Sequence, residues 1–474
     1  MLKVNRILFS LVQTIFCFLS LSTQLQAQNT VEDSLYIIGE IKLQGNEQTK
    51  PHIVLRELAF TTGDTLTQNQ LQLLRLRGTR QIFNLKLFTS VNIEIGIKDS
   101  VTGTTPVTIY LKERWYLFVV PILEVGDRNF NQWWISKRLD RLNYGMSVTR
   151  FNMRGRNETI RVNLQSGFTR KASLDYSFPY INKKLTIGAA INFTYSDNKE
   201  VWYKTEKNKL QFYRDPERVL YRRYKSGLEF TYRKKIYTTQ TLGAEYNRLW
   251  VADTVSRAEL NPNFFGDSAT KQTSIYTYYR CVYDMRDFRA YALNGFMLSA
   301  EVGNYSFLSG QKPIVATYIT AEFYKKLAPR NYFSISVSGK YSSTKTQPYN
   351  LFRALGYGYF VRGFEYYVVD GQHFALTKIN YRYTVLPQKQ ITLNTTKLKK
   401  FRTIPFAAYL KAYYDAGYVD NPNATIDNTF TNTYLGGMGV GIDIVTYYDR
   451  VFMFEYSFNN KGQSGLFLHY TMTF

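Results

Sequence analysis

The chain has 474 residues, of which 60 are Lys or Arg and 36 are Asp or Glu, so its net charge is +24. It holds 40 Tyr and 33 Phe, yet its mean hydropathy is only −0.30. Many aromatic residues at a low mean hydropathy are unusual for a soluble enzyme and typical of strands with one apolar and one polar face. The charge fits either a nucleic-acid binder or a surface that meets anionic lipid or acidic chains.

The N-terminus decides between these two kinds of partner. The stretch "MLKVNRILFSLVQTIFCFLSLSTQLQAQ" begins with Lys3 and Arg6, continues with an apolar run over residues 7–21 and has a polar end that closes on Ala27. This pattern predicts a secretory signal peptide over residues 1–27, too short and wrongly flanked to be a spanning helix. An exported chain meets lipid and other exported proteins, so we expect no nucleic-acid partner.

The segment after the signal peptide, residues 35–113, predicts a small α/β module. Pro51 stands where the first turn of a helix tolerates proline, and Thr49 is a candidate cap for that helix. The two last segments of the module alternate with period two, as paired strands do. In chain order we expect a strand over residues 35–46, a helix over 49–58, a helix over 68–88 and two strands over 89–98 and 105–113.

This module resembles a POTRA domain, the periplasmic module of the BamA/TamA superfamily of outer-membrane barrel proteins. The resemblance covers "IGEIKLQGNEQTKPHIVLREL", the "GDTLT" turn and "LKLFTSVNIEI", including Gly45, Gly63, Asp64 and Phe88. It implies binding of unfolded client proteins or accessory subunits by addition of a strand to a sheet edge. Periplasmic chaperones and accessory lipoproteins are therefore candidate partners. The alternative is a generic α/β spacer.

Residues 115–474 predict an all-β transmembrane barrel of about 16 antiparallel strands. We expect no helix here, because strand-like runs alternate with clusters of Gly, Asn, Asp and Pro. A transmembrane strand needs about 9–11 residues, so the length accommodates sixteen strands with their turns, and closure would satisfy the edge groups in lipid. A soluble β-sandwich would show similar alternation. The expected runs are 116–125, 144–151, 158–167, 172–180, 185–195, 226–233, 241–251, 274–284, 295–303, 316–327, 332–342, 374–386, 405–417, 433–445, 451–459 and 466–474.

The last run has the clearest two-faced pattern. Apolar residues at every second position from Leu466 to Phe474 alternate with Phe467, His469 and two threonines. A chain that ends on phenylalanine in such a strand resembles the C-terminal signal of outer-membrane barrels. The residues matching that signal are Tyr470, Met472 and Phe474.

The stretch "GYFVRGFEYY" between the eleventh and twelfth runs places one arginine among aromatic residues. It resembles a superfamily signature in the sixth extracellular loop, which folds back into the barrel. The matching residues are Val361, Arg362, Gly363 and Phe364. The resemblance implies that Arg362 meets acidic and aromatic residues of the wall. In "AYYDAGYV" these are Asp415 as ion partner and Tyr413 as aromatic partner, next to Gly417. A buried guanidinium independently needs such partners.

Two departures from the family pattern lead to expectations of their own. Asn380 stands where many members have a glutamate that helps to hold the loop arginine, so we expect a looser latch. The segment "DMRDFRAYALNGF" resembles a family turn element, but Ala292 replaces its usual proline. The residues matching that element are Asp284, Arg286, Asp287 and Gly295.

No catalytic motif is recognisable in the chain. It has no G-x-S-x-G, P-loop or H-E-x-x-H, and its histidines, His52, His373 and His469, do not have the spacing of metal ligands. We therefore expect no enzyme activity, no cofactor and no metal site.

The resemblance implies an outer-membrane protein assembly factor, located in the outer membrane with its POTRA-like domain in the periplasm. It would insert or translocate β-barrel or surface proteins without nucleotide hydrolysis, and its partners would be outer-membrane lipid and unfolded outer-membrane or secreted clients. The seam between the first and last strands would open during insertion. Two alternatives stay open: a dedicated two-partner-type secretion pore, and a porin-like barrel in which the latch is only structural.

Overall fold

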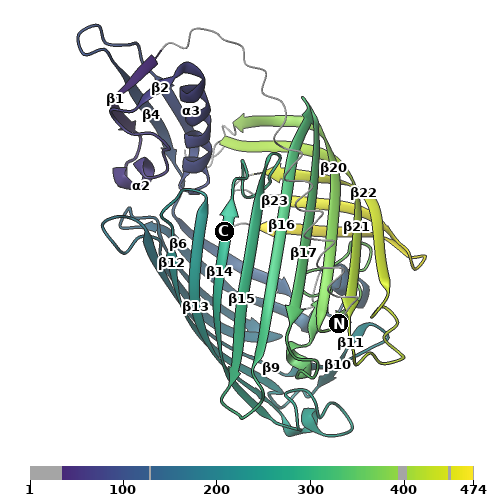
Figure 1. The fold of residues 1–474 in the computed structure, drawn as a ribbon. Helices are drawn as coiled ribbons and strands as arrows, with labels where there is room; N and C mark the ends of the chain where they lie inside the picture. Colours follow the sequence, from purple (N-terminus) through teal and green to yellow (C-terminus); the bar gives the residue numbers. More distant parts are fainter. Residues whose placement is uncertain (1–34, 127–129, 393–402, 447–449, 473–474) are drawn as a thin grey trace.

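The computed structural model describes residues 35–126, 130–392, 403–446 and 450–472, which form an N-terminal domain and one large sheet (Figure 1). The predicted signal peptide, residues 1–27, lies outside this part of the chain. None of the described helices is both long and apolar enough to cross a membrane.

The N-terminal domain packs two helices against a four-stranded sheet of order β2-β1-β4-β3. Its elements follow the predicted order, with a short extra strand, β2, where the sequence predicted a turn. Thr49 does not cap α2: its hydroxyl donates to Glu113 at 2.6 Å, and Lys50 occupies the N-cap position. The elements are β1 (Leu35–Gln44), α2 (Pro51–Leu55), β2 (Thr65–Thr67), α3 (Gln68–Phe83), β3 (Phe88–Ile95) and β4 (Thr104–Glu113).

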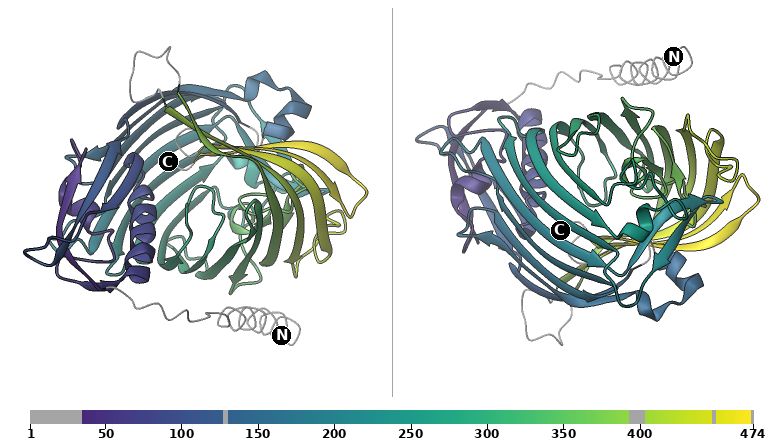
Figure 2. Two further views of the ribbon diagram at one scale, coloured as in Figure 1. Left: turned by 90° about the horizontal axis from the view of Figure 1, so that it is seen from above. Right: turned by 90° about the horizontal axis from the view of Figure 1, so that it is seen from below.

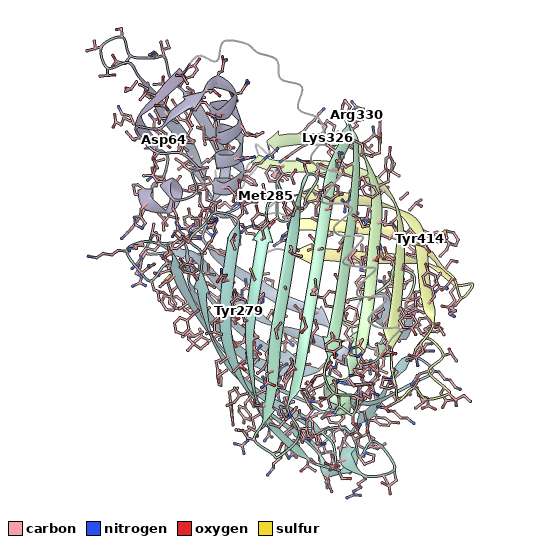
Figure 3. All side chains as sticks on the ribbon, in the orientation of Figure 1. Asp64, Tyr279, Met285, Lys326, Arg330 and Tyr414 are labelled. Atoms are coloured by element: carbon pink, nitrogen blue, oxygen red, sulfur yellow. The ribbon has the colours of Figure 1, made fainter. Side chains whose placement is uncertain are left out.

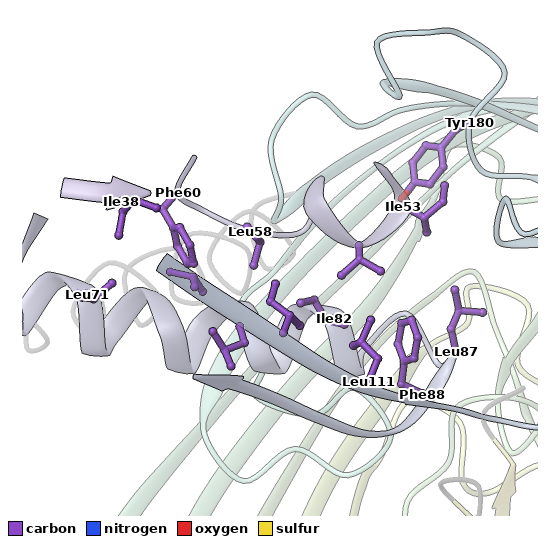
Figure 4. Close-up of a cluster of buried hydrophobic side chains, with 14 of the residues drawn as sticks. Ile38, Ile53, Leu58, Phe60, Leu71, Ile82, Leu87, Phe88, Leu111 and Tyr180 are labelled. Carbon is purple, nitrogen blue, oxygen red and sulfur yellow. The ribbon is translucent and has the colours of Figure 1, made fainter. Parts of the chain in front are cut away.

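The core of this domain lies between α3 and the sheet (Figure 4). Helix α3 begins with a capping box, in which the side chains of Thr67 and Gln70 each bind the other's backbone N–H. Its buried residues include Leu71 and Ile82, which face the strands. Tyr180, which follows barrel strand β8, packs into the same apolar cluster. The domain and the barrel therefore share part of one core.

Sixteen strands form a single antiparallel sheet in chain order, from β5 to β24. Seen along its axis the sheet curves into a ring, with the N-terminal domain over one side of the opening (Figure 2). Each of the sixteen predicted runs has its strand. These are β5 (Leu117–Val125), β6 (Leu142–Met153), β7 (Glu158–Gly167), β8 (Thr169–Phe178), β9 (Ile187–Asn198), β12 (Tyr221–Tyr232), β13 (Thr238–Val251), β14 (Lys271–Asp284), β15 (Gly295–Phe307), β16 (Ile314–Ala328), β17 (Asn331–Ser342), β20 (His373–Thr392), β21 (Thr403–Asp420), β22 (Tyr434–Thr446), β23 (Arg450–Asn459) and β24 (Ser464–Met472).

The two ends of the barrel differ. We call the end next to the N-terminal domain the domain end, and the opposite end, which carries the long connections, the loop end (Figure 1). The loop-end connections contain the hairpin of β10 (Glu200–Glu206) and β11 (Lys209–Arg214), and the short pair β18 (Arg353–Leu355) and β19 (Val369–Asp370).

The expectation of no helix after residue 115 is wrong, because the described residues there form one short α-helix and three short 3₁₀ helices. Helix α4 (Phe130–Ser136) lies in the connection between β5 and β6. It has only seven residues, too few to be stable in isolation, and it is held by tertiary contacts with β24.

The outer surface of the barrel is apolar. Tyr279 and Tyr414 point outward from their strands in Figure 3, and 46% and 40% of their surfaces are exposed. On β24, Leu466 is 70% exposed while its neighbour Phe467 is 2% exposed, so the predicted alternation is confirmed there. An outward apolar band with polar groups inside is what a barrel in lipid requires.

The sheet does not close through its end strands. Within the described residues, β5 pairs only with β6 and β24 pairs only with β23, so no backbone ladder joins β5 to β24. The expected seam thus lies between the edges of two strands that no backbone ladder joins among the described residues.

Candidate functional site

The connection between β17 and β20, residues 343–372, folds against the inner wall of the barrel, and we call it the latch loop. An apolar cluster anchors it: Val361 and Phe364 are 1% and 4% exposed and pack with Leu376 of β20 and Val419 of β21. The predicted signature residues therefore lie inside the protein and not on a solvated loop.

Arg362 at the tip of the loop is held by a carboxylate on β21. Its backbone N–H and its Nε donate to Oδ2 of Asp415 at 3.0 and 2.9 Å, and its Nη2 donates to Oδ1 at 2.5 Å. The guanidinium carbon lies 3.8 Å from the centre of the Tyr413 ring. The structure thus brings together the three residues that the resemblance paired. A forked ion pair covered by an aromatic face is a strong arrangement for a buried arginine.

A second carboxylate also reaches this arginine. Nη1 of Arg362 donates to Asn380 at 2.8 Å and to Oε1 of Glu455 on β23 at 3.3 Å. Glu455 in turn binds Lys411 at 2.7 Å, and Lys411 binds Asp443 at 2.5 Å. The looser latch was expected because Asn380 carries no charge, but Glu455 of β23 supplies the second carboxylate that β20 does not.

Burial opposes the charge on Arg362, but its hydrogen bonds to Asp415 and the field of Asp415 and Glu455 outweigh that effect. The net result raises the pKa of the Arg362 guanidinium above its ordinary value. The guanidinium of Arg362 therefore stays charged at every physiological pH.

Glycines make the close approach of the loop to the wall feasible. Gly363 has φ +90°, a conformation that favours glycine, and Gly437 of β22 lies directly under the loop. A Cβ at Gly437 would come within 1.9 Å of the carbonyl oxygen of Arg362. A Cβ at Gly417 would come within 2.5 Å of Val361. Gly417, which the resemblance placed beside the partners of Arg362, therefore lies against Val361 of the latch loop.

The latch loop also contacts the last strand. Glu365 accepts a hydrogen bond from the N–H of Gly363 at 2.7 Å, and its other oxygen lies 3.3 Å from Nε2 of His469 on β24. His469 stacks on Phe360 with ring centres 5.2 Å apart and lies 3.2 Å from Glu455. Sequence reasoning missed these contacts. The inward-facing Glu455, between the exposed Phe454 and Tyr456, was the signal that could have found them.

Glu365, Glu455 and His469 place three potential metal-ligand atoms within 4.8 Å of one another. Lys411 and Arg362 already neutralise Glu455, however, so a further cation would meet two positive charges. We assign no metal to this group.

The predicted turn element joins β14 to β15 at the domain end. Asp284 forms a forked pair with Arg286, whose third nitrogen reaches Glu322 at 2.9 Å. Asp287 accepts hydrogen bonds from the backbone of residues 288 and 293, and Gly295 has φ +107°. The element is a closed turn even though Ala292 replaces the proline.

This turn binds the N-terminal domain, and so do the turns that follow β8 and β12. Asn84, which follows α3, donates to the carbonyl of Asp287 at 3.2 Å. Arg233, after β12, forms a forked pair with Glu57 at 2.6 and 2.8 Å, and Arg56 donates to the carbonyls of Arg233 and Leu185. We call these contacts the domain clamp. No pattern in the sequence located them, because they join segments more than a hundred residues apart.

A cavity of about 500 Å³ lies between the N-terminal domain and the domain ends of β20 to β22. Arg80 and Lys112 line it on the domain side, together with residues 89–91 of the edge strand β3, and Phe288 and Phe406 line it on the barrel side. Among the described residues that line it there is no Asp or Glu. The cavity is therefore positive and partly aromatic.

The C-terminal signal is described only in part. Tyr470 lies in β24 and is 45% exposed on the outer face. Met472 is the last residue of β24, and Phe474 lies outside the described residues.

Family models match most of the chain. A POTRA model, described as a surface antigen variable number repeat, matches residues 36–114, and an Omp85 superfamily domain model matches residues 152–448. The chain belongs to the Omp85 superfamily. The resemblance to outer-membrane barrel proteins with POTRA domains is thereby confirmed, and members of this superfamily are transport or assembly factors.

Solved structures of Omp85 proteins share the fold of this chain. BamA from Haemophilus ducreyi lacking POTRA domains 1–3 has a TM-score of 0.50 at 14% identity, covering 92% of this chain and 84% of that one. CdiB from Acinetobacter baumannii has a TM-score of 0.51 at 11% identity, covering 92% and 73%. CdiB from Escherichia coli has a TM-score of 0.51 at 11% identity, covering 95% and 92%. No curated protein matches the chain significantly.

Proposed function

We propose that this Omp85 protein is an outer-membrane protein assembly factor that inserts or translocates β-barrel or surface proteins without nucleotide hydrolysis. Its POTRA domain would lie in the periplasm, at the domain end of the barrel. The observation that carries the proposal is the seam: β5 and β24 share no ladder among the described residues, while the latch loop holds β24 from inside.

An open seam supports strand insertion for a physical reason. Each edge strand presents a row of backbone N–H and C=O groups that water does not satisfy inside the bilayer. A client strand entering from the lumen satisfies these groups as it leaves for the lipid, so the driving force comes from strand pairing and burial. No nucleotide is needed for such a step.

The cavity at the domain end supports delivery of the client. It borders β3, an edge strand of the POTRA sheet, at residues 89–91. An extended client segment that pairs with this edge would lie beside the domain ends of β20 to β22. Arg80 and Lys112 favour segments with acidic side chains.

The contacts at the loop end argue against a passive porin. Asn208 in the hairpin of β10 and β11 accepts a hydrogen bond from the N–H of Val368 in the latch loop at 2.9 Å, and its side chain accepts one from the N–H of Phe430 at 3.0 Å. Three loop-end connections are thus joined to one another. A steady open channel through this end would require them to separate.

The proposal is tested by depleting the protein and measuring the outer-membrane proteome by quantitative mass spectrometry. We expect many unrelated barrels to fall together, with rescue by the wild type and not by Arg362→Ala. Arg257→Ala, at an exposed ion pair in another loop, is the matched control and should rescue. Loss of one secreted protein alone would favour a dedicated exporter. An unchanged proteome would overturn the proposal.

A further inference from the structure

The outer edge of β24 is capped by a side chain. The N–H of Leu468 donates to Oδ1 of Asn131 at 3.0 Å, and Nδ2 of Asn131 donates to the carbonyl oxygen of Leu468 at 3.4 Å. Leu468 stands opposite Phe454 in the ladder with β23. In an antiparallel sheet, successive residues of a strand turn their N–H and C=O groups to alternate sides. A residue that does not hydrogen-bond to the strand on one side presents both groups to the other side. Asn131 therefore binds both groups that Leu468 turns away from β23.

The amide of Asn131 imitates a neighbouring strand. It offers one donor and one acceptor to a single residue, as a backbone unit does in a ladder. Asn131 is 5% exposed and lies in α4, in the connection that leaves β5. The loop that follows β5 thus occupies the edge of β24, with which β5 itself does not pair.

Two large apolar residues of α4 are exposed. Trp134 and Ile135 are 60% and 66% exposed, and Phe130 contacts the rings of Trp133 and Trp134 at 5.8 and 5.9 Å. Aromatic residues at the rim of a barrel sit at the membrane–water interface. These exposed apolar side chains fit a lipid surface, which would keep α4 next to β24.

We propose that α4 is an autoinhibitory clasp that blocks strand addition at the edge of β24. The inference rests on the proposed function, in which a client strand pairs at the seam. A pairing strand would lie about 4.8 Å from β24, in the space that the Asn131 amide occupies. Client strand and clasp therefore exclude each other at Leu468.

The clasp is weak enough for a client strand to displace it. Asn131 satisfies one residue of β24, whereas an added strand satisfies alternate residues along the same edge, including Leu466 and Leu468. A full client strand therefore outcompetes the clasp, and a short unrelated segment does not. The clasp would protect the edge from unspecific pairing between rounds of assembly.

The test measures strand addition and edge protection in the purified full-length protein. The probe is a fluorescein-labelled peptide with the sequence of residues 450–459, which is the sequence that pairs with β24 on its other side. The variants are Asn131→Ala and the similar-sized Asn131→Leu. Asn423→Ala, which removes another loop asparagine bonded to a backbone carbonyl, is the control. Retained heat-modifiable mobility in electrophoresis shows that each variant is folded.

We expect both Asn131 variants to bind the peptide about tenfold more tightly than the wild type, because two hydrogen bonds no longer compete with it. We also expect faster hydrogen exchange at the amide of Leu468, with the control unchanged. Unchanged peptide affinity overturns the clasp, even if exchange increases.

The result of this peptide-binding test can be distinguished from the result of the depletion experiment that tests the proposed function. Tighter peptide binding together with an unchanged proteome on depletion would retain the clasp as edge protection and remove the assembly role. Unchanged peptide binding together with a broad loss of barrels would retain the assembly role and remove the clasp.

Discussion

At the scale of single residues, the latch is a charged network that stays buried. Arg362 and Asp415 are 5% and 0% exposed, and each has its hydrogen-bonding capacity directed at the other or at the adjacent strands. Removing one partner of such a pair leaves an uncompensated buried charge. Substitutions here should therefore act strongly and non-additively.

Arg362→Lys keeps the charge of the latch but loses its planar fork. We expect the free energy of unfolding to fall by about 2 kcal/mol, the size of a lost hydrogen bond between charged groups. Urea titration followed by heat-modifiable mobility measures this. In a double-mutant cycle, Asp415→Asn should add little once Arg362 is replaced. Two fully additive effects would show that the pair does not act as a unit.

Gly437→Ala should expel the loop from the wall, because the new Cβ would overlap the carbonyl of Arg362. The readout is trypsin cleavage after Arg362, which is inaccessible while that residue is buried. Gly358→Ala is the matched control in the same loop, since its Cβ would meet nothing within 4 Å. Equal cleavage of the two variants would refute the close packing of latch and β22.

The pairing of Arg362 with Asp415 was predictable because each lies in a short local motif with a family resemblance. Glu455 and His469 were not, although both stand in correctly predicted strands. Their contact with the latch depends on which residues of β23 and β24 lie level with the loop tip. That level is set by strand stagger and loop folding, which alternation alone does not encode.

At the scale of elements, the domain clamp fixes α2 to the barrel. Tyr180 is buried in the POTRA core, and Arg233 donates two hydrogen bonds to Glu57. Burial, aided by the charge of Glu57, raises the pKa of Tyr180, so its hydroxyl stays neutral and able to donate to Glu57. The POTRA domain therefore has one preferred orientation on the barrel.

Glu57→Gln should loosen this orientation, because it removes the charge that two arginines contact. We expect hydrogen exchange over residues 180–186 and 233–237 to rise about tenfold. Glu47→Gln is the control, since Glu47 is exposed in the same domain. Equal protection from hydrogen exchange in the two variants would mean that apolar packing around Tyr180 suffices to hold the domain.

Helix α4 shows where prediction of elements from sequence fails. Its seven residues are too few for a helical pattern to emerge, and tertiary contacts with β24 decide its structure. The long strands were predictable for the opposite reason. Their alternation extends over eight or more residues each and is imposed by two different solvents, lipid and lumen.

At the scale of the whole molecule, the order of the strands could be predicted from the sequence. The contacts between distant strands, loops and the POTRA domain could not. Sixteen runs in chain order gave the antiparallel sheet, because consecutive strands pair when short turns join them. The unpaired seam, the joined loops at the loop end and the cavity beside the POTRA edge arise from contacts between distant segments. These features carry the proposed function.

The most direct test of the assembly role is reconstitution in lipid vesicles without nucleotide. A urea-unfolded eight-stranded outer-membrane barrel is diluted into vesicles that hold the wild-type protein or Arg362→Ala, and its folding is followed by heat-modifiable mobility. We predict faster folding with the wild type than in empty vesicles, and a loss of most of that gain with the variant. Folding at the same rate in empty and wild-type vesicles would contradict the account.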